Sequence, residues 1–218
     1  MDLIDEAELR DGRHVVLRPL LVEDEPAYRR FVETVSDEAQ YYRFFSPRRY
    51  LSEQEIAHFV HVDYRDRLAL VAVIGEDIVG VARYDRHRDP GLAEVAFILV
   101  DDVQGNGLAG RLLRLLAVGA ERNGIHRFTA SVLPDNHKML QVFAKSGMLL
   151  HRHFVDGIVE VTMAVEPVAV EPVVAVEPVV AVEPVVAVEP VVAVEPVVAG
   201  EAGTAAEPGR GQERSGKA

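Results

Sequence analysis

The sequence predicts an α+β fold, with a β-sheet core, helices on both faces and no regular alternation of strand and helix. Two observations predict it. Three apolar runs follow one another within residues 68–100 with only turn signals between them, which indicates consecutive strands. Residues 108–122 then carry apolar side chains at helical spacing and end at Asn123-Gly124, a typical helix C-cap.

Local signals place the elements before residue 68. A strand is expected at 14–18. A helix is expected around 24–35, with Pro26 in its first turn, where the missing N–H leaves no bond unmade. Ser52 and Glu55 form a capping box that opens a second helix.

The C-terminal part of the fold is expected to add a strand, a short helix and a hairpin. The strand lies at 127–133, the helix at 136–146 is ended by Gly147, and the hairpin turns at Asp156-Gly157. The expected order is therefore strand, two helices, three strands, helix, strand, helix and two strands, about seven strands in all.

Composition restricts the class of protein. The chain of 218 residues has room for one well-buried domain and an appendage. It has no cysteine, which excludes disulfides, thiolate metal sites and a cysteine acyl-enzyme. A net charge of -12 argues against a nucleic-acid partner. An acidic N-terminus and the lack of any run of about 18 apolar residues predict a cytoplasmic protein without a membrane span.

The expected domain organisation is a leader at 1–11, a catalytic domain at 12–163 and a low-complexity tail at 164–218. In the tail, Ala-Val-Glu-Pro-Val-Val recurs with a period of six after one five-residue step. A six-residue period can indicate a β-helix, but a proline in each repeat removes a strand hydrogen bond and excludes that structure. The tail is therefore expected to be extended and disordered, with the docking of a partner as its alternative role.

A glycine-rich loop stands between the last of the three consecutive strands and the long helix. Gly105, Gly107 and Gly110 spell G-x-G-x-x-G, and backbone N–H groups at a helix N-terminus bind pyrophosphate. A nicotinamide dinucleotide site, however, requires this loop after the first strand of a repeated βαβ unit. Here roughly 100 residues and four expected strands precede the loop, which favours a different pyrophosphate ligand.

The loop Gln104-Gly105-Asn106-Gly107-Leu108-Ala109 resembles the [Q/R]-x-x-G-x-[G/A] signature of the GNAT family of N-acetyltransferases, over about residues 12–163. The resemblance implies the GNAT fold, a mixed and mostly antiparallel sheet, with acetyl-CoA as cosubstrate and no metal. It places acetyl-CoA on a strand that splays from its neighbour, on the loop and on the start of a later helix. The implied contact residues are Phe97, Ile98, Leu99, Gln104, Gly105, Asn106, Gly107, Leu108, Ala109, Gly110 and Asn136.

Other segments are similar to the Pat-type protein lysine acetyltransferase domains of this family, which implies a protein substrate with a reactive lysine. Two positions depart from the family pattern. Phe143 stands where many members have a tyrosine that protonates the leaving thiolate, and Met148 stands where they have phenylalanine. A thiolate whose conjugate acid has a pKa of about 8.5 can act as the leaving group without a dedicated acid. The similar segments are Arg18-Pro19 and residues 41–47, 81–83, 93–97 and 132–139.

Glu94 is the candidate general base. It is the one charged residue in the apolar run 92–100, so its carboxylate is expected to be desolvated and able to accept a proton. The resemblance implies the same role, because Pat-type domains carry a glutamate base on this strand. The alternative is a glutamate that faces solvent. The implied mechanism is direct attack of the amine on the thioester, with a backbone N–H near Ile98 or Leu99 stabilising the oxyanion.

Other candidate sites are weaker. The histidines include no pair or carboxylate cluster at metal-ligand spacing, and His151 with His153 is more typical of a solvated pair. Tyr41 and Tyr42, beside Arg43, are expected to pack under the first helices, with substrate contact as the alternative. Two other functions remain open: a small-molecule amine acetyltransferase, and a non-catalytic acyl-CoA sensor that uses the tail for interaction.

Overall fold

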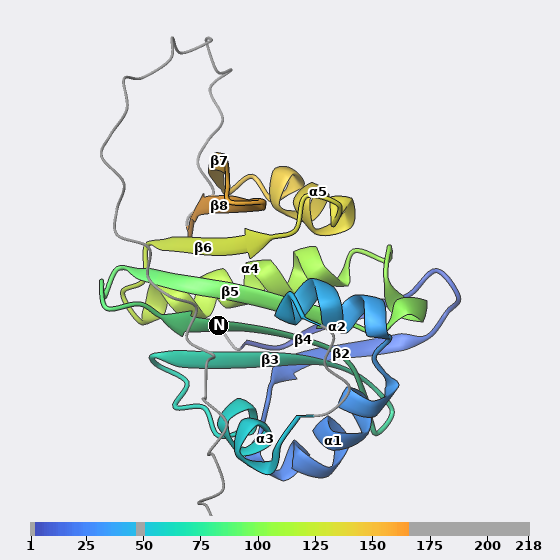
Figure 1. The fold of residues 1–218 in the computed structure, drawn as a ribbon. Helices are drawn as coiled ribbons and strands as arrows, with labels where there is room; N and C mark the ends of the chain where they lie inside the picture. Colours follow the sequence, from blue (N-terminus) through green and yellow to red (C-terminus); the bar gives the residue numbers. More distant parts are fainter. Residues whose placement is uncertain (1–2, 47–50, 166–218) are drawn as a thin grey trace, which may run out of the picture. The chain divides into compact units, whose positions relative to one another are not determined.

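The computed structural model describes residues 3–46 and 51–165, which form one open sheet of eight strands with helices on both faces (Figure 1). Neighbouring strands are antiparallel except β5 and β6, which run parallel. The predicted α+β class and mostly antiparallel sheet are confirmed. In spatial order the strands are β1 (Asp5–Glu8), β2 (His14–Pro19), β3 (Arg67–Ile74), β4 (Asp77–Arg86), β5 (Leu92–Leu99), β6 (Arg127–Val132), β8 (Ile158–Ala164) and β7 (Leu149–Val155).

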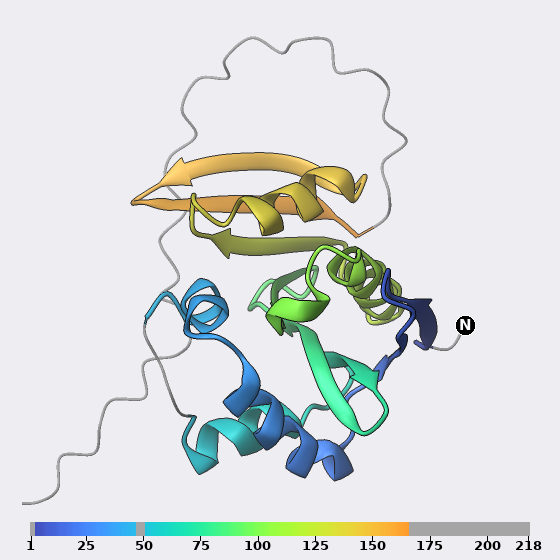
Figure 2. The same cartoon turned by 90° about the vertical axis from the view of Figure 1, so that its right-hand side faces the viewer.

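The helices form two groups, one on each face of the sheet (Figures 1 and 2). The helices α1, α2 and α3 cover one face, and α4 and α5 cover the other. Short 3-10 turns precede α1 and α4. The helices are α1 (Glu25–Thr34), α2 (Asp37–Phe44), α3 (Glu53–Val60), α4 (Leu108–Arg122) and α5 (His137–Lys145), and the 3-10 turns are η1 (Val22–Asp24) and η2 (Asp101–Val103).

Strand β3 shows how one apolar run serves both faces. Leu68 and Leu70 pack in the cluster under α4, whereas Ala69 and Val71 pack in the cluster with α1 and α3. A strand buried on both faces is apolar throughout, because successive side chains point to opposite sides. Gly119 lets α4 approach β3 closely, since a Cβ at that position would lie 2.5 Å from Leu68 Cδ2.

The sheet opens between β5 and β6. Parallel pairing joins Leu92–Glu94 to residues 127–129, and β6 pairs along its whole length with β8 on its other side. Residues 95–99 remain paired with β4 but have no strand partner on the β6 side. The splayed strand that the resemblance implies is therefore present. It leaves open backbone directly before the glycine-rich loop.

The structure adds two elements to the predicted order. Strand β1 lies within the expected leader and pairs with β2, which makes eight strands where about seven were expected. Its sequence, Asp-Glu-Ala-Glu, has no apolar alternation that would indicate a strand. The helix α2 was also missed. Its N-cap is Ser36, whose side chain accepts a hydrogen bond from the Ala39 N–H, so a capping signal was present in the sequence.

The predicted caps and turns are otherwise confirmed. Ser52 and Glu55 form the capping box of α3, and Asn123 caps α4 ahead of Gly124. The hairpin between β7 and β8 turns at Asp156 and Gly157, whose φ angles of 49° and 84° are those of a type I′ turn.

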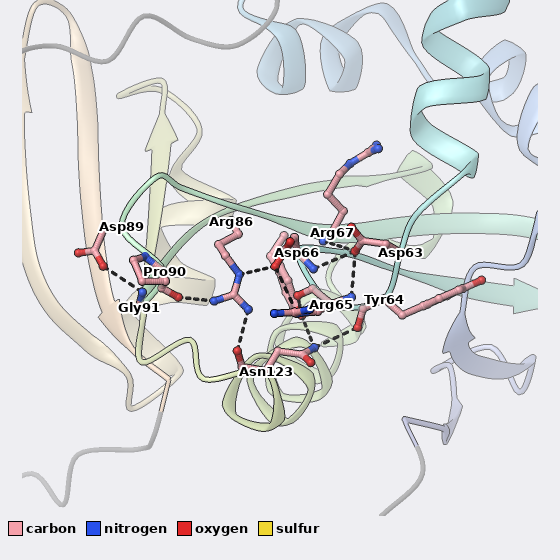
Figure 3. Close-up of polar contacts among 11 residues, drawn as sticks. Asp63, Tyr64, Arg65, Asp66, Arg67, Arg86, Asp89, Pro90, Gly91 and Asn123 are labelled. Atoms are coloured by element: carbon pink, nitrogen blue, oxygen red, sulfur yellow. Dashed lines mark hydrogen bonds and ion pairs between the residues drawn. The ribbon is translucent and has the colours of Figure 1, made fainter.

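Arg86 joins three segments at the end of the sheet where β5 begins (Figure 3). It donates to the carbonyl oxygens of Pro90, in the β4–β5 connection, and of Asn123, at the end of α4. Its Nε forms an ion pair with Asp66 Oδ1 at 2.8 Å. Asn123 Nδ2 donates in turn to the Tyr64 carbonyl at 3.0 Å, so the α3–β3 loop is tied to the end of α4.

Asp63 organises the loop before β3 (Figure 3). Its Oδ1 accepts hydrogen bonds from the backbone N–H groups of Arg65, Asp66 and Arg67, at 2.8 to 2.9 Å. Burial by itself would raise the pKa of the Asp63 carboxyl, but these three N–H donors outweigh it and leave the pKa below its usual value. A carboxylate with a lowered folded-state pKa stabilises the fold above the unfolded-state pKa.

We predict that Asp63→Ala lowers the free energy of unfolding by about 1 kcal/mol at pH 7, because three N–H groups lose their acceptor. Asp63→Asn keeps an acceptor oxygen and should lose less. The difference between wild type and Asp63→Asn should vanish as the pH falls through the folded-state pKa of Asp63. Urea unfolding at a series of pH values measures this, with Glu76→Gln on the exposed β3–β4 turn as control. A difference that grows toward low pH would contradict the assignment.

Candidate active site

The glycine-rich loop turns the chain from β5 into α4. Gly105 and Gly107 have φ angles of 76° and 82°, in the left-handed region that favours glycine. Gly107 is the N-cap of α4, and no side chain caps the helix there. The first intrahelical bond runs from the Arg111 N–H to the Gly107 carbonyl at 3.2 Å, so the N–H groups before it are available to an anion at the positive end of the helix.

Two side chains of the loop are engaged within the protein. Asn106 Nδ2 donates to the carbonyls of Val103 and Gln104, and its Oδ1 accepts from the Arg10 N–H. Gln104 Nε2 donates to the Leu99 carbonyl at 3.2 Å. The side chains of Gln104 and Asn106 therefore fix the shape of the loop, and its backbone is the part that remains open to a ligand.

The start of α5 lies beside the loop. Lys138 Nζ donates to Gln104 Oε1 at 2.8 Å, which links the first turn of α5 to the glycine-rich loop. Asn136, an expected acetyl-CoA contact, is the N-cap of α5, and its side chain accepts from the Met139 N–H at 3.1 Å. The structure therefore brings together the loop and the starts of two helices. Lys138 was not singled out from the sequence, since a lone lysine on a helix gives no signal.

The predicted contact residues Phe97, Ile98 and Leu99 occupy the part of β5 that has lost its β6 partner. The Phe97 ring packs edge-on against Phe143, with ring centroids 6.0 Å apart, under α5. The Ile98 side chain points to the opposite face and lines a cavity under α1 and α2. Because the side chains are used by the core and the cavity, the remaining hydrogen-bonding surface is the backbone edge of this segment that faces away from β4, where the Leu99 carbonyl already accepts from Gln104 Nε2.

Glu94 lies where β5 and β6 separate. It pairs with Thr129 of β6 and Asp85 of β4, and it is the last β5 residue with a β6 partner. The expectation that its carboxylate is desolvated is wrong, because Glu94 is exposed. Ala93 and Val95, which point to the α4 face, are buried instead. Successive side chains of a strand point to opposite faces of the sheet, so Ala93 and Val95 face α4 and Glu94 faces the other side.

Sequence reasoning missed a group of charged residues beside Glu94. Arg83 is 3% exposed on β4 and donates to Asp85, which also accepts from Arg67. Burial by itself raises the pKa of the Asp85 carboxyl, but Arg83 and Arg67 outweigh it and leave the pKa below its usual value. Arg43 of α2 lines the same cavity as Arg83. The sequence did carry one signal for this group, because Arg83 is a charged residue within the apolar part of β4.

The remaining sequence candidates are not assembled into a site. In the part of the chain that the structure describes, no three His, Cys, Asp or Glu residues are grouped so as to hold a metal ion. His151 and His153 are exposed on the edge strand β7. Tyr41 is 41% exposed, so the expectation that it packs under the first helices is wrong. None of the helices in residues 3–46 and 51–165 has the length and apolar content to cross a bilayer.

Comparison with known proteins agrees with this geometry. Residues 14–149 match the family model described as an acetyltransferase (GNAT) domain. A protein named acetyltransferase PA5475, from Pseudomonas aeruginosa, is 32% identical over 148 residues, which are 66% of this chain and 80% of that protein. Acetyltransferase Pat from Mycolicibacterium smegmatis is 32% identical over 168 residues, 76% of this chain and 50% of Pat.

The solved structures include a similar domain. The GNAT domain of S. lividans PAT superposes with a TM-score of 0.69 at 40% identity, covering 74% of this chain and 97% of that domain. The chain spans about half the length of Pat itself. The family match covers the splayed strand, the glycine-rich loop and the start of α5 together. The chain therefore belongs to the GNAT family and is an acyl-CoA-dependent N-acetyltransferase with acetyl-CoA as its cosubstrate.

Proposed function

We propose that this enzyme acetylates the side-chain amines of protein lysines, with Glu94 as the general base. The observation that carries the proposal is the position of Glu94, an accessible carboxylate at the point where β5 separates from β6. The acceptor class follows from the Pat-type resemblance and is supported by the relatives whose printed names are Pat and PAT, at 32% and 40% identity. Fold alone does not choose between acceptors of different size.

In this proposal the donor lies along the opening in the sheet. The pyrophosphate of acetyl-CoA is held by the N–H groups of Gly105, Gly107 and the first turn of α4. The pantetheine arm hydrogen-bonds to the open backbone of residues 97–99. The side-chain oxygen of Asn136 caps α5, and its side-chain NH₂ group is left to donate to the arm. The thioester then lies close to Ile98, four residues along β5 from Glu94.

The proposed reaction is a direct transfer in a ternary complex. Glu94, directly or through one water, takes a proton from the lysine ammonium, whose pKa in water is about 10.4. The neutral nitrogen attacks the thioester carbon, a backbone N–H near Ile98 or Leu99 stabilises the oxyanion, and the C–S bond breaks. Phe143 is 2% exposed and has no hydroxyl, so the thiolate leaves without protonation from that position. The exposed surroundings of Glu94 allow the proton to pass on to solvent.

The acceptor class is tested by acetyl transfer from acetyl-CoA to a cell-lysate proteome and, separately, to a panel of small amines, read by mass spectrometry. Acetylated lysines confined to one or two proteins would support the proposal. Turnover of a small amine with no protein acetylation would place the enzyme among the small-molecule acetyltransferases. Binding of acetyl-CoA without transfer to either acceptor would indicate a sensor.

We predict that Glu94→Gln lowers kcat/KM for the acceptor by about 10²- to 10⁴-fold at neutral pH, the usual contribution of a general base. The substitution keeps the shape of the side chain and should leave acetyl-CoA affinity unchanged. Steady-state kinetics and calorimetry measure the two quantities. The matched control is Glu160→Gln on β8, which is also exposed. Near wild-type turnover of Glu94→Gln would refute the role of base.

Gly107→Ala should weaken acetyl-CoA binding by about tenfold or more, because a Cβ would intrude where the pyrophosphate meets the helix. The matched control is Gly124→Ala at the other end of α4. Both glycines have a left-handed φ, 82° and 73°, and a Cβ at either would meet no atom of the protein within 4 Å. Backbone strain is therefore common to both variants. Equal affinities for acetyl-CoA would remove the loop from the binding site.

The role of the tail is tested by truncating the chain after Val165. The cut is placed there because β8 continues to Ala164 and Val165 is buried in the core. If the tail is a passive appendage, deletion of residues 166–218 should leave kcat/KM unchanged for both a lysine peptide and its parent protein. A loss of activity toward the protein alone would instead indicate that the tail docks the substrate.

A further inference from the structure

A cavity lies between α1, α2 and α3 on one side and strands β4 and β5 on the other. Its walls are mainly apolar and aromatic, and two arginines also line it, Arg43 from α2 and Arg83 from β4. The floor on β5 is formed by Ala96 and Ile98, the side chains that follow Glu94 on the same face. The aromatic part of the wall is formed by Tyr28, Phe31, Phe44 and Phe59.

The charges in this cavity are not balanced. Arg83 forms an ion pair with Asp85 at 3.0 Å, and Arg67 shares the same carboxylate, also at 3.0 Å. Among the residues that the structure describes, no carboxylate forms an ion pair with Arg43. Glu94 and Asp85 act on Arg43 only from a longer distance. Arg83 and Arg67 thus share the single carboxylate of Asp85. The positive charge of Arg43 has no ion-pair partner among the described residues.

Arg43 is in an unfavourable environment for a cation. Burial, followed by the like charge of Arg83, lowers the pKa of the Arg43 guanidinium, although Tyr28, Glu94 and Asp85 oppose the shift. The guanidinium carbon lies 5.0 Å from the centre of the Phe44 ring, a contact worth only a small part of the lost hydration. Arg43 is half-buried, so its guanidinium is partly desolvated and has no ion pair among the described residues, and an anionic ligand would offset both.

Building on the proposed function, we propose that this cavity binds a carboxylate carried by one of the reactants, and that the reactant is the acyl donor. The enzyme would then accept a dicarboxylic acyl-CoA, such as succinyl-CoA, in addition to acetyl-CoA. The thioester next to Ile98 directs the acyl chain along Ala96 and Ile98, and its far carboxylate meets Arg43 and Arg83. The reaction is unchanged: the N–C bond forms, the C–S bond breaks, and the distant carboxylate takes no part in the chemistry.

The size of the cavity favours the donor over the acceptor. Its volume is about 20 Å³, room for one or two water molecules, which a carboxylate group can fill. A protein lysine cannot place a second group in this space, because the space is too small for its neighbouring residues. The end of a short acyl chain can. Arginine is also suited to this ligand, since its planar fork matches a carboxylate with two parallel hydrogen bonds.

Succinyl-CoA and butyryl-CoA make a direct test, because their four-carbon acyl chains differ only in a terminal carboxylate or methyl. The wild type should bind succinyl-CoA about tenfold to hundredfold more tightly than butyryl-CoA. Arg43→Met should abolish this preference, and Arg43→Lys should restore part of it. Arg30→Met, an exposed arginine of α1 outside the cavity, should keep it. Calorimetry on the full chain gives these affinities without turnover, so the result does not depend on the acceptor or on Glu94.

Kinetics with two acceptors distinguish the sources of the carboxylate. If Nα-acetyl-lysine is preferred over its methylamide, and only Arg43→Met removes that preference, the carboxylate site is supported but its assignment to the donor is overturned. Equal wild-type affinities for the two acyl-CoA thioesters, together with no acceptor preference, overturn the proposal. So does a preference for succinyl-CoA that survives in Arg43→Met, provided that the variant's melting temperature shows it to be folded.

Discussion

The parting of β5 from β6 after Glu94 is the feature on which the rest of the site depends. A continuous parallel ladder would use the backbone groups of residues 95–99 within the sheet. Because β6 pairs with β8 and turns away, these groups remain open on one side, at the point where the chain enters the glycine-rich loop. The same parting places Glu94 at the edge of the opening. Donor binding and proton transfer therefore depend on one local change in strand pairing.

The elements around the opening have separate tasks. The helix α4 supplies uncapped N–H groups for an anion, while Gln104 and Asn106 hold the loop through bonds to Leu99, Val103 and Arg10. On the opposite face, α1, α2 and α3 enclose a small cavity with an unbalanced positive charge. At the far end of the strands, Arg86 and Asp63 tie the loops together without contacting the opening. Binding, selectivity and stability are thus carried by different groups of residues.

The sequence predicted most of the fold, because strong local signals coincided with tertiary packing. Capping residues and turn glycines placed α3, α4 and the last hairpin correctly. Strand β1 has no apolar pattern and is held by pairing with β2, which local reasoning does not detect. Glu94 was found, but its burial was misjudged because an apolar run does not reveal which face is covered. Arg43 of α2 and Arg83 of β4 line one cavity although 40 residues separate them, and no spacing rule indicates this.

The most direct test of the account is a crystal structure with a conjugate of CoA and a lysine peptide. The account predicts that the sulfur lies between β5 and β6, with pantetheine amides bonded to the backbone of residues 97–99 and the pyrophosphate against the first turn of α4. The lysine nitrogen should lie about 3 Å from Glu94, or one water away. A conjugate bound outside the opening, or a lysine nitrogen on the face opposite Glu94, would contradict it.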